Sequence, residues 1–361
     1  MSLTRRWWLD WWLPHLTLRT ALLLPASWMF ALAAAIRRAL YRYRLLAAHA
    51  LPVPVIVVGN LTVGGSGKTP LVIALVRRLA AQGYRPGVIS RGYGRAARNR
   101  GDGHLHGPVE VAPGSDPARC GDEPVLIARA TAVPVFIDAD RVCAARALLA
   151  AHPQVNLIVS DDGLQHYALA RDIEIAVFDA RGAGNGQLLP AGPLREPLSR
   201  TAGLTALVHN ASGVDAAKNG LYQRFSSMHV MKLLPQTCYR LGDPAQTCAI
   251  EQLAERVARH GTDGTIDTIA AIAGIGHPER FFTTLRAAGL APIEYPFHDH
   301  HAFTRTDLAA ISASTLIMTE KDALKCSAFN DARIWVLPVT AHLDAAFYDL
   351  ILEKLRGHQA A

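Results

Sequence analysis

The sequence predicts an α/β protein: a first domain built on a mainly parallel sheet, followed by a second, smaller α/β domain. Three observations predict this. Short apolar, β-branched runs recur along the chain, helical patterns lie between several of them, and a glycine-rich stretch joins the first run to a helix pattern. With 361 residues, half of them hydrophobic, the chain is long enough for two packed domains.

The N-terminal segment, residues 1–45, differs from the rest of the chain. It holds five of the six tryptophans, and an uncharged run of 17 residues from Thr20 to Ile36 is followed by four arginines. As a helix this run would measure about 25 Å, short of the ~30 Å hydrocarbon core. We expect a membrane-associated helix that lies in the interface or barely spans, with the arginines on the cytoplasmic side. A buried core helix is the alternative, and no small-residue cleavage site indicates a signal peptide.

Six apolar runs are expected to form the strands of the first domain. They are nearly continuous rather than alternating, as is typical of buried parallel strands. Their ranges are 53–58, 86–90, 133–138, 155–160, 172–179 and 205–209. Between the first two runs, Leu71, Leu75, Val76 and Leu79 share one face of a helix that Gly83 would end.

The stretch "VGNLTVGGSGKTP" (58–70) has the composition of a phosphate-binding loop. The backbone N–H groups that would bind phosphate oxygens belong to Gly64, Gly65, Ser66 and Gly67. Lys68 would reach the β- and γ-phosphates of a nucleotide, and the Thr69 hydroxyl would hold Mg²⁺. Thr62 stands where the strict pattern has glycine, but a strand before the loop and a helix after it favour nucleotide binding.

Two adjacent carboxylates follow the apolar run 155–160. Asp161 and Asp162 would lie at the carboxyl end of a buried strand, where ligands gather in open α/β sheets and where phosphoryl-transfer enzymes hold the metal of the nucleotide. A solvated Asp-Gly turn is the alternative. Gln165 and His166 follow and would either support this site or be structural.

Three further stretches carry candidate residues. Asp122 and Glu123 stand just before a helix pattern, where acids also serve as caps. In "FHDHHAF" (297–303), a histidine paired with an aspartate, among His298, Asp299, His300 and His301, fits a general base better than a metal ligand. Arg195 and Glu196 belong to a Pro-Gly loop, and loops often carry function.

The second domain is expected from about residue 226. The stretch 229–243 suggests a pair of short linker strands. Strands are then predicted at 268–276, 314–319 and 333–339, with a helix at 278–289.

Composition excludes several classes of protein. The net charge of +7 fits an anionic membrane surface or a phosphorylated substrate. No basic stripe interleaved with aromatic residues indicates a nucleic-acid partner. The five cysteines show no paired spacing, so neither a disulfide framework nor a zinc site is predicted.

The motifs together resemble one family, the tetraacyldisaccharide 4'-kinases of lipid A biosynthesis. The resemblance runs from about residue 15 to about 340, and the Thr62 form of the loop is also that of the family. It is carried, in this order, by "VGNLTVGGSGKTP", "SRGYGR", "GDEP", "SDDGLQH", "LLPAGPLREP", "FHDHHAFT" and "TEKDALKC".

The resemblance implies transfer of the γ-phosphate of ATP, with Mg²⁺, to the 4'-hydroxyl of an acylated glucosamine disaccharide 1-phosphate. The implied units are the membrane-associated segment 1–45, a P-loop kinase domain at 46–225, and linker strands with a smaller domain at 226–361. By matched motif, Lys68 and Thr69 hold phosphates and metal, Asp161 and Asp162 organise the metal, and Asp122 and His300 deprotonate the sugar hydroxyl. The residues implied to line or support the site are Glu123, Arg141, His166, Arg195 and Glu196. The enzyme would work as a monomer at the inner membrane, with its active site on the cytoplasmic face and no nucleic-acid partner.

Two other classes of function fit the motifs less well. A GTPase-like P-loop protein needs an Asn/Thr-Lys-x-Asp motif, and in "MTEKDA" the lysine, Lys321, stands one place too late. A membrane adaptor that uses nucleotide as a switch would have little use for the motifs of Asp122 and His300.

Overall fold

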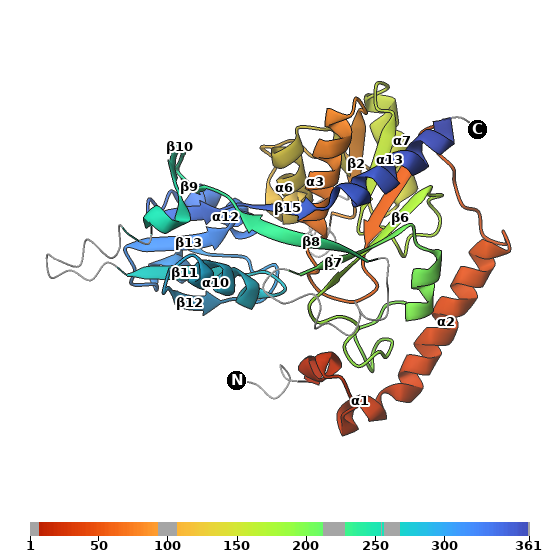
Figure 1. Ribbon diagram of the computed structural model, residues 1–361, viewed down its shortest axis with the longest axis horizontal. Coiled ribbons are helices and arrows are strands. Elements are labelled where there is room, and N and C mark those ends of the chain that lie inside the picture. Colours follow the sequence, from red (N-terminus) through yellow and green to blue (C-terminus); the bar gives the residue numbers. More distant parts are fainter. Residues whose placement is uncertain (1–6, 93–106, 212–227, 254, 256–267, 360–361) are drawn as a thin grey trace, which may run out of the picture.

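The computed structural model describes residues 7–92, 107–211, 228–253, 255 and 268–359, and it contains two sheets that lie side by side (Figure 1). All eleven strands predicted from the sequence overlap strands of the structure. The predicted α/β class is therefore confirmed. The first six residues of the N-terminal segment and residues 212–227, around the predicted domain boundary, lie outside the described part.

The first sheet has nine strands in the order β15-β8-β7-β6-β1-β5-β2-β4-β3. Every neighbouring pair is parallel except at the two edges, where β3 and β15 run antiparallel to their neighbours. The strands are β1 (Val55–Gly59), β2 (Pro86–Ser90), β3 (Val109–Glu110), β4 (Val135–Ile137), β5 (Leu157–Asp161), β6 (Ile173–Asp179), β7 (Ala206–Asn210), β8 (Met228–Pro235) and β15 (Val339–Leu343).

Helices cover both faces of this sheet. Ile56 and Val58 of β1 pack in the cluster that includes residues of α3 (Lys68–Ala81), α6 (Asp122–Thr131) and α13 (Ala345–Gln359). Val55 and Val57 point into the opposite cluster, to which α7 (Arg141–Ala151) contributes. Burial on both faces explains why the strand sequences are continuously apolar.

The second sheet has six strands in the order β10-β9-β14-β13-β11-β12, parallel from β14 to β12. Its strands are β9 (Cys238–Arg240), β10 (Asp243–Cys248), β11 (Ile269–Ala273), β12 (Ile293–Pro296), β13 (Thr315–Thr319) and β14 (Ile334–Leu337). Phe282 and Leu285 of α10 (Pro278–Ala287) pack in one of its clusters. The other cluster holds Leu308 of α11 (Arg305–Ala309) and Ala323 of α12 (Glu320–Cys326).

The chain passes between the sheets at two neighbouring points. The two strands expected in 229–243 are β8 and β9, and they belong to different sheets. After β14, the chain returns to the first sheet as β15 and α13 (Figure 1). At the crossing, Pro235 lies opposite Val339, and the Gln236 N–H donates to the Pro338 carbonyl at 2.9 Å.

The N-terminal segment forms a 3₁₀ turn (Trp7–Trp12), α1 (Leu18–Leu22) and α2 (Leu24–Arg42), which runs along the right-hand edge of Figure 1. The Trp11 indole N–H donates to the Pro190 carbonyl at 3.0 Å, and the Ser27 hydroxyl donates to the Leu188 carbonyl at 2.7 Å. The segment therefore packs on the loop 185–193. Among the helices of the described residues, none combines the length and the apolar character needed to cross a bilayer.

We expect the C-terminal helix to be required for the stability of the first sheet. Phe347 of α13 is fully buried in the core cluster that α3 and α6 share. Its replacement by Ala should lower the free energy of unfolding by about 3–5 kcal/mol, measured by urea denaturation. Asp349→Ala, on the exposed side of the same helix, is the matched control and should change it by less than about 0.5 kcal/mol. Equal effects of the two changes would show that α13 does not contribute to this core.

Candidate active site

The glycine-rich loop connects β1 to α3 and is held in place by two buried asparagines. Gly64 and Gly67 have φ values of +92° and +90°, which only glycine adopts without strain. The Asn60 side chain donates to the Gly64 carbonyl at 3.1 Å, and the Asn210 side chain donates to the Ser66 carbonyl at 3.0 Å. A Cβ atom at Gly67 would lie 2.4 Å from Asn210 Nδ2. The sequence alone did not assign a role to either asparagine: Asn60 lies within the loop motif but outside its glycine-rich part, and Asn210 ends β7 without a distinctive motif.

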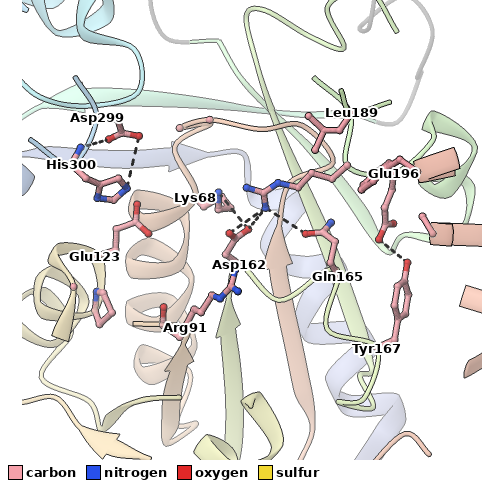
Figure 2. Close-up of a pocket in the computed structure, with 18 of the residues that line it drawn as sticks. Lys68, Arg91, Glu123, Asp162, Gln165, Tyr167, Leu189, Glu196, Asp299 and His300 are labelled. Carbon is pink, nitrogen blue, oxygen red and sulfur yellow. Dashed lines mark hydrogen bonds and ion pairs between the residues drawn. The ribbon is translucent and has the colours of Figure 1, made fainter. Parts of the chain in front are cut away.

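Asp162 lies at the centre of a group of cations at the end of β5. Lys68 Nζ is 3.6 Å from Asp162 Oδ1 (Figure 2). Arg195 Nη1 is 3.3 Å from Asp162 Oδ2. Burial alone would raise the pKa of Asp162, but Lys68 and Arg195 lower it below its ordinary value. The residue also has a φ of +50°, a strained conformation for a non-glycine residue and one that is common in active sites.

The environment of Asp161 is that of a carboxylate that could bind a cation. It is fully buried, and within the described part of the chain its Oδ1 has no hydrogen-bond partner. Burial, and then the neighbouring Glu123, raise its pKa above the ordinary value. Thr69, in the first turn of α3, supplies a hydroxyl. Mg²⁺ bound with a nucleotide commonly needs only one or two carboxylates besides the phosphate oxygens, so Thr69 and Asp161 fit such an ion. In the described residues no group of three or more His, Cys, Asp or Glu could hold a metal ion by itself.

Asp122 and His300 come from different sheets and meet in the site. Asp122 is the first residue of α6, and His300 lies in the loop between β12 and α11. His300 Nδ1 and Asp122 Oδ2 are 3.1 Å apart, and because a carboxylate only accepts, the ring donates its Nδ1–H. This hydrogen bond raises the pKa of His300. Burial alone would raise the pKa of Asp122, but His300 and two lysines lower it to about 2. His300 also has a φ of +58°.

The two lysines near Asp122 belong to α12 and were not assigned from the sequence. Lys321 Nζ is 3.8 Å and Lys325 Nζ is 4.0 Å from Asp122 Oδ2. Lys321 also contacts Glu123 Oε1 at 3.0 Å. The available signal was the stretch "TEKDALKC" (319–326), which follows a strand end as the other site motifs do.

The remaining predicted residues lie on the other side of Asp162. Glu196 is buried and accepts a hydrogen bond from the Tyr167 hydroxyl at 2.7 Å (Figure 2). Arg141 is buried behind Asp162 and donates to its carbonyl oxygen at 3.3 Å. His166 lies 3.7 Å from Asp140. Arg195 and Glu196 line a large pocket beside α2 and α6, whereas Arg141 and His166 lie behind its wall.

Two pockets meet at the glycine-rich loop. The larger, about 730 Å³, lies between α2, α6 and the loop 189–196, and includes Asp122, Asp162 and His300. The smaller, about 200 Å³, lies between the glycine-rich loop and α10 and α12 of the second sheet. Gly65, Lys68 and Glu123 line both pockets. A group held by Lys68 at this junction would therefore be accessible from either side.

The site has a phosphate-binding loop, carboxylates at a strand end, and a carboxylate–imidazole pair beside the junction of two pockets. Together these features define a phosphotransferase of the P-loop class. The profile of the tetraacyldisaccharide-1-P 4'-kinase family matches residues 19–356. The chain belongs to this family and is a kinase, as the motifs had indicated.

Individual relatives extend over nearly the whole chain. The tetraacyldisaccharide 4'-kinase of Herminiimonas arsenicoxydans is 48% identical over 348 residues, covering 94% of this chain and 93% of the relative. That of Dechloromonas aromatica (strain RCB) is 47% identical, covering 94% of each. The crystal structure of "apo" form LpxK from Aquifex aeolicus in complex with ATP is similar with a TM-score of 0.72 and 27% identity, covering 93% of this chain and 99% of that one.

We expect Asp122 to control the titration of His300. Asp122→Asn removes the carboxylate that raises the pKa of His300, while burial, which lowers this pKa, remains. The pKa should therefore fall, measured by NMR of ¹³C-labelled histidine rings with the His300 signal identified from His300→Asn. Asp307→Asn, which contacts His301 at 3.2 Å instead, is the control and should leave His300 unchanged. An unchanged pKa in Asp122→Asn would contradict the pairing.

Proposed function

We propose that this kinase transfers the γ-phosphate of ATP to the 4'-hydroxyl of a tetraacyldisaccharide 1-phosphate, giving the bisphosphorylated lipid A precursor, lipid IVA. The observation that carries the proposal is the junction of the two pockets at Lys68, with the Asp122–His300 pair beside it. Membership of the family and the similarity to an LpxK in complex with ATP support both substrates.

ATP is assigned to the smaller pocket. The pocket joins the backbone of the glycine-rich loop to apolar residues such as Ile73, Leu126 and Phe281, which suit the base and ribose. Lys68 would contact the terminal phosphates. Thr69, Asp161 and Asp162 would hold Mg²⁺, which neutralises charge on the phosphate oxygens when it is bound.

The transfer step follows from the arrangement beside the junction. The 4'-oxygen forms a bond to the γ-phosphorus, the bond from that phosphorus to the β–γ bridging oxygen breaks, and ADP leaves. The hydroxyl proton passes to the Asp122–His300 pair. Since the pKa of Asp122 is lowered to about 2 and that of His300 is raised, the imidazole takes the proton at Nε2 while Asp122 orients the ring.

The acceptor is assigned to the larger pocket. One stripe of α2 lines it, with Phe30, Ala33 and Ala34 followed by Arg37 and Arg38. Residues three and four apart share a helix face, so apolar contacts and two cations point the same way. This combination suits a molecule that carries both acyl chains and a phosphate.

We propose a membrane-bound enzyme whose N-terminal helices lie in the cytoplasmic interface of the inner membrane. Leu18, Leu22, Met29 and Leu32 are 63–80% exposed, an unusual density of apolar surface for helices in water. We further propose that the two sheets are separate domains joined at β8 and β15, and that the enzyme acts as a monomer, because one chain supplies both pockets.

Transfer of radiolabelled phosphate from ATP to the purified disaccharide lipid tests the proposed function. Lys68→Ala removes a positive charge from the developing phosphoryl charge and should lower kcat about 10²–10³-fold. Lys354→Ala, exposed on α13, is the control and should keep full activity. Thermal unfolding should show that both variants fold. Transfer at the wild-type rate by folded Lys68→Ala would overturn the nucleotide assignment, and absence of lipid phosphorylation by the wild type would overturn the acceptor.

We expect the exposed apolar face, not the pocket face, of α1 and α2 to bind the bilayer. Changing Leu18, Leu22, Met29 and Leu32 to Gln should weaken co-sedimentation with anionic vesicles at least about a hundredfold, because each buried side chain contributes about 1.5–3 kcal/mol. Activity on detergent-dispersed acceptor should remain. The control is Leu234→Gln combined with Ile293→Gln, two exposed residues on strands β8 and β12. Unchanged sedimentation of the four-site variant would exclude this face. These replacements also preserve the contacts of Trp11 and Ser27 with the loop 185–193, which deletion of the whole N-terminal segment would remove.

A further inference from the structure

Lys321 occupies a position where the two sheets meet at the site. It stands in the first turn of α12, directly after β13 of the second sheet. Its Nζ lies 3.0 Å from Glu123 and 3.8 Å from Asp122, both on α6 beside the first sheet. It also lies 3.5 Å from Asp299, the neighbour of His300 (Figure 2 labels Glu123, Asp299 and His300). One ammonium group therefore contacts three carboxylates from two segments that are far apart in the sequence.

Without Lys321 these three carboxylates would repel one another and an incoming nucleotide. Lys325 does not replace it, because it pairs with the buried Asp322 at 2.8 Å and lies over the Phe303 ring at 5.1 Å. Burial works against the charge on Lys321, but Glu123, Asp122 and Asp299 raise its pKa above the ordinary value. The side chain is only 16% exposed, so water screens these contacts weakly.

We propose that Lys321 is a positioning residue for phosphoryl transfer, which holds Asp122, Glu123 and Asp299 together across the two sheets and sets the charge around the intact Asp122–His300 pair. The inference rests on the proposed function, in which that pair accepts the hydroxyl proton. Lys321 lines the smaller pocket, to which the nucleotide is assigned. Its Nζ already donates to Glu123 and Asp299 and also lies close to the Asp122 carboxylate. It acts through these carboxylates rather than by contact with a phosphate.

The sign of the electrostatic effect follows from the groups that face the pair. Asp122 faces His300, Lys321 and Lys325, with Glu123 beside it on α6, and His300 faces Asp122, Asp299 and Lys321. The charge of Lys321 lowers the pKa of both Asp122 and His300. Removing that charge raises both pKa values. The acid limb of the pH–rate profile therefore moves to higher pH, whether Asp122 or His300 determines that limb.

The test compares Lys321→Met, Lys321→Arg and the surface control Lys354→Met in the full chain. By NMR of ¹³C-labelled histidine rings, the pKa of His300 should rise by about one unit in Lys321→Met, less in Lys321→Arg, and not at all in Lys354→Met. This measurement needs no substrate, so it decides the role of Lys321 even if the acceptor is another molecule. An unchanged His300 titration in folded Lys321→Met overturns the proposal.

Kinetics provide the second readout. In Lys321→Met, the acid limb of kcat/KM should move up by about one pH unit, so that activity below the limb falls about tenfold, while the Kd for ATP changes less than about threefold. Lys321→Arg should recover most of the activity. A large loss of ATP affinity with an unshifted pH profile would make Lys321 a phosphate ligand and overturn the positioning role. If Lys321→Met does not fold, Lys321→Gln, which also removes the charge, takes its place, and an unshifted His300 titration together with an unshifted pH profile in that variant overturns the proposal.

Discussion

The 3.1 Å contact between Asp122 and His300 is the constraint on which the rest of the structure depends, because Asp122 begins a helix that packs on the first sheet and His300 lies in a loop that follows a strand of the second. The chain joins these sheets only through the neighbouring crossings near Pro235 and Pro338 among the residues that the structure describes. A displacement of about 1 Å is enough to weaken catalysis that relies on positioning. The site therefore needs non-covalent contacts that fix one sheet against the other, and the ion pairs of Lys321 lie at this boundary.

The site also has to keep several charges out of water. Asp122, Asp161 and Asp162 converge around the junction of the pockets, and burial alone disfavours the charged form of each. Asp122 and Asp162 have cations within 4 Å and their pKa values are lowered, whereas Asp161 has a raised pKa and an oxygen without a hydrogen-bond partner in the described structure. This difference supports a bound cation at Asp161, since an isolated buried carboxylate is costly.

Local patterns were sufficient for much of the fold and part of the site. Continuous apolar runs predicted the parallel strands, because burial on both faces removes polar positions. The glycine-rich loop and Asp162 could be placed because they follow strands directly. The return of β15 and α13 to the first sheet could not be predicted, since it depends on pairing between β8 and β15, more than 100 residues apart. Lys321 was missed for a related reason: its partners Asp122 and Glu123 lie about 200 residues earlier, and only tertiary structure brings them together.

The two faces of α2 would connect the proposed membrane surface to the candidate active site. Phe30, Ala33 and Arg37 line the larger pocket, whereas Met29 and Leu32 on the same helix are exposed. If the exposed face rests on a bilayer, as we propose, the pocket opens beside the lipid surface, and an acylated sugar can reach the junction while its chains stay in apolar surroundings. The contacts of Trp11 and Ser27 with the carbonyl groups of Pro190 and Leu188 hold this helix against the loop that carries Arg195 and Glu196. The membrane-facing surface and the site would then be oriented by the same few hydrogen bonds, so that the position of the acceptor hydroxyl relative to Lys68 depends on how α2 is docked.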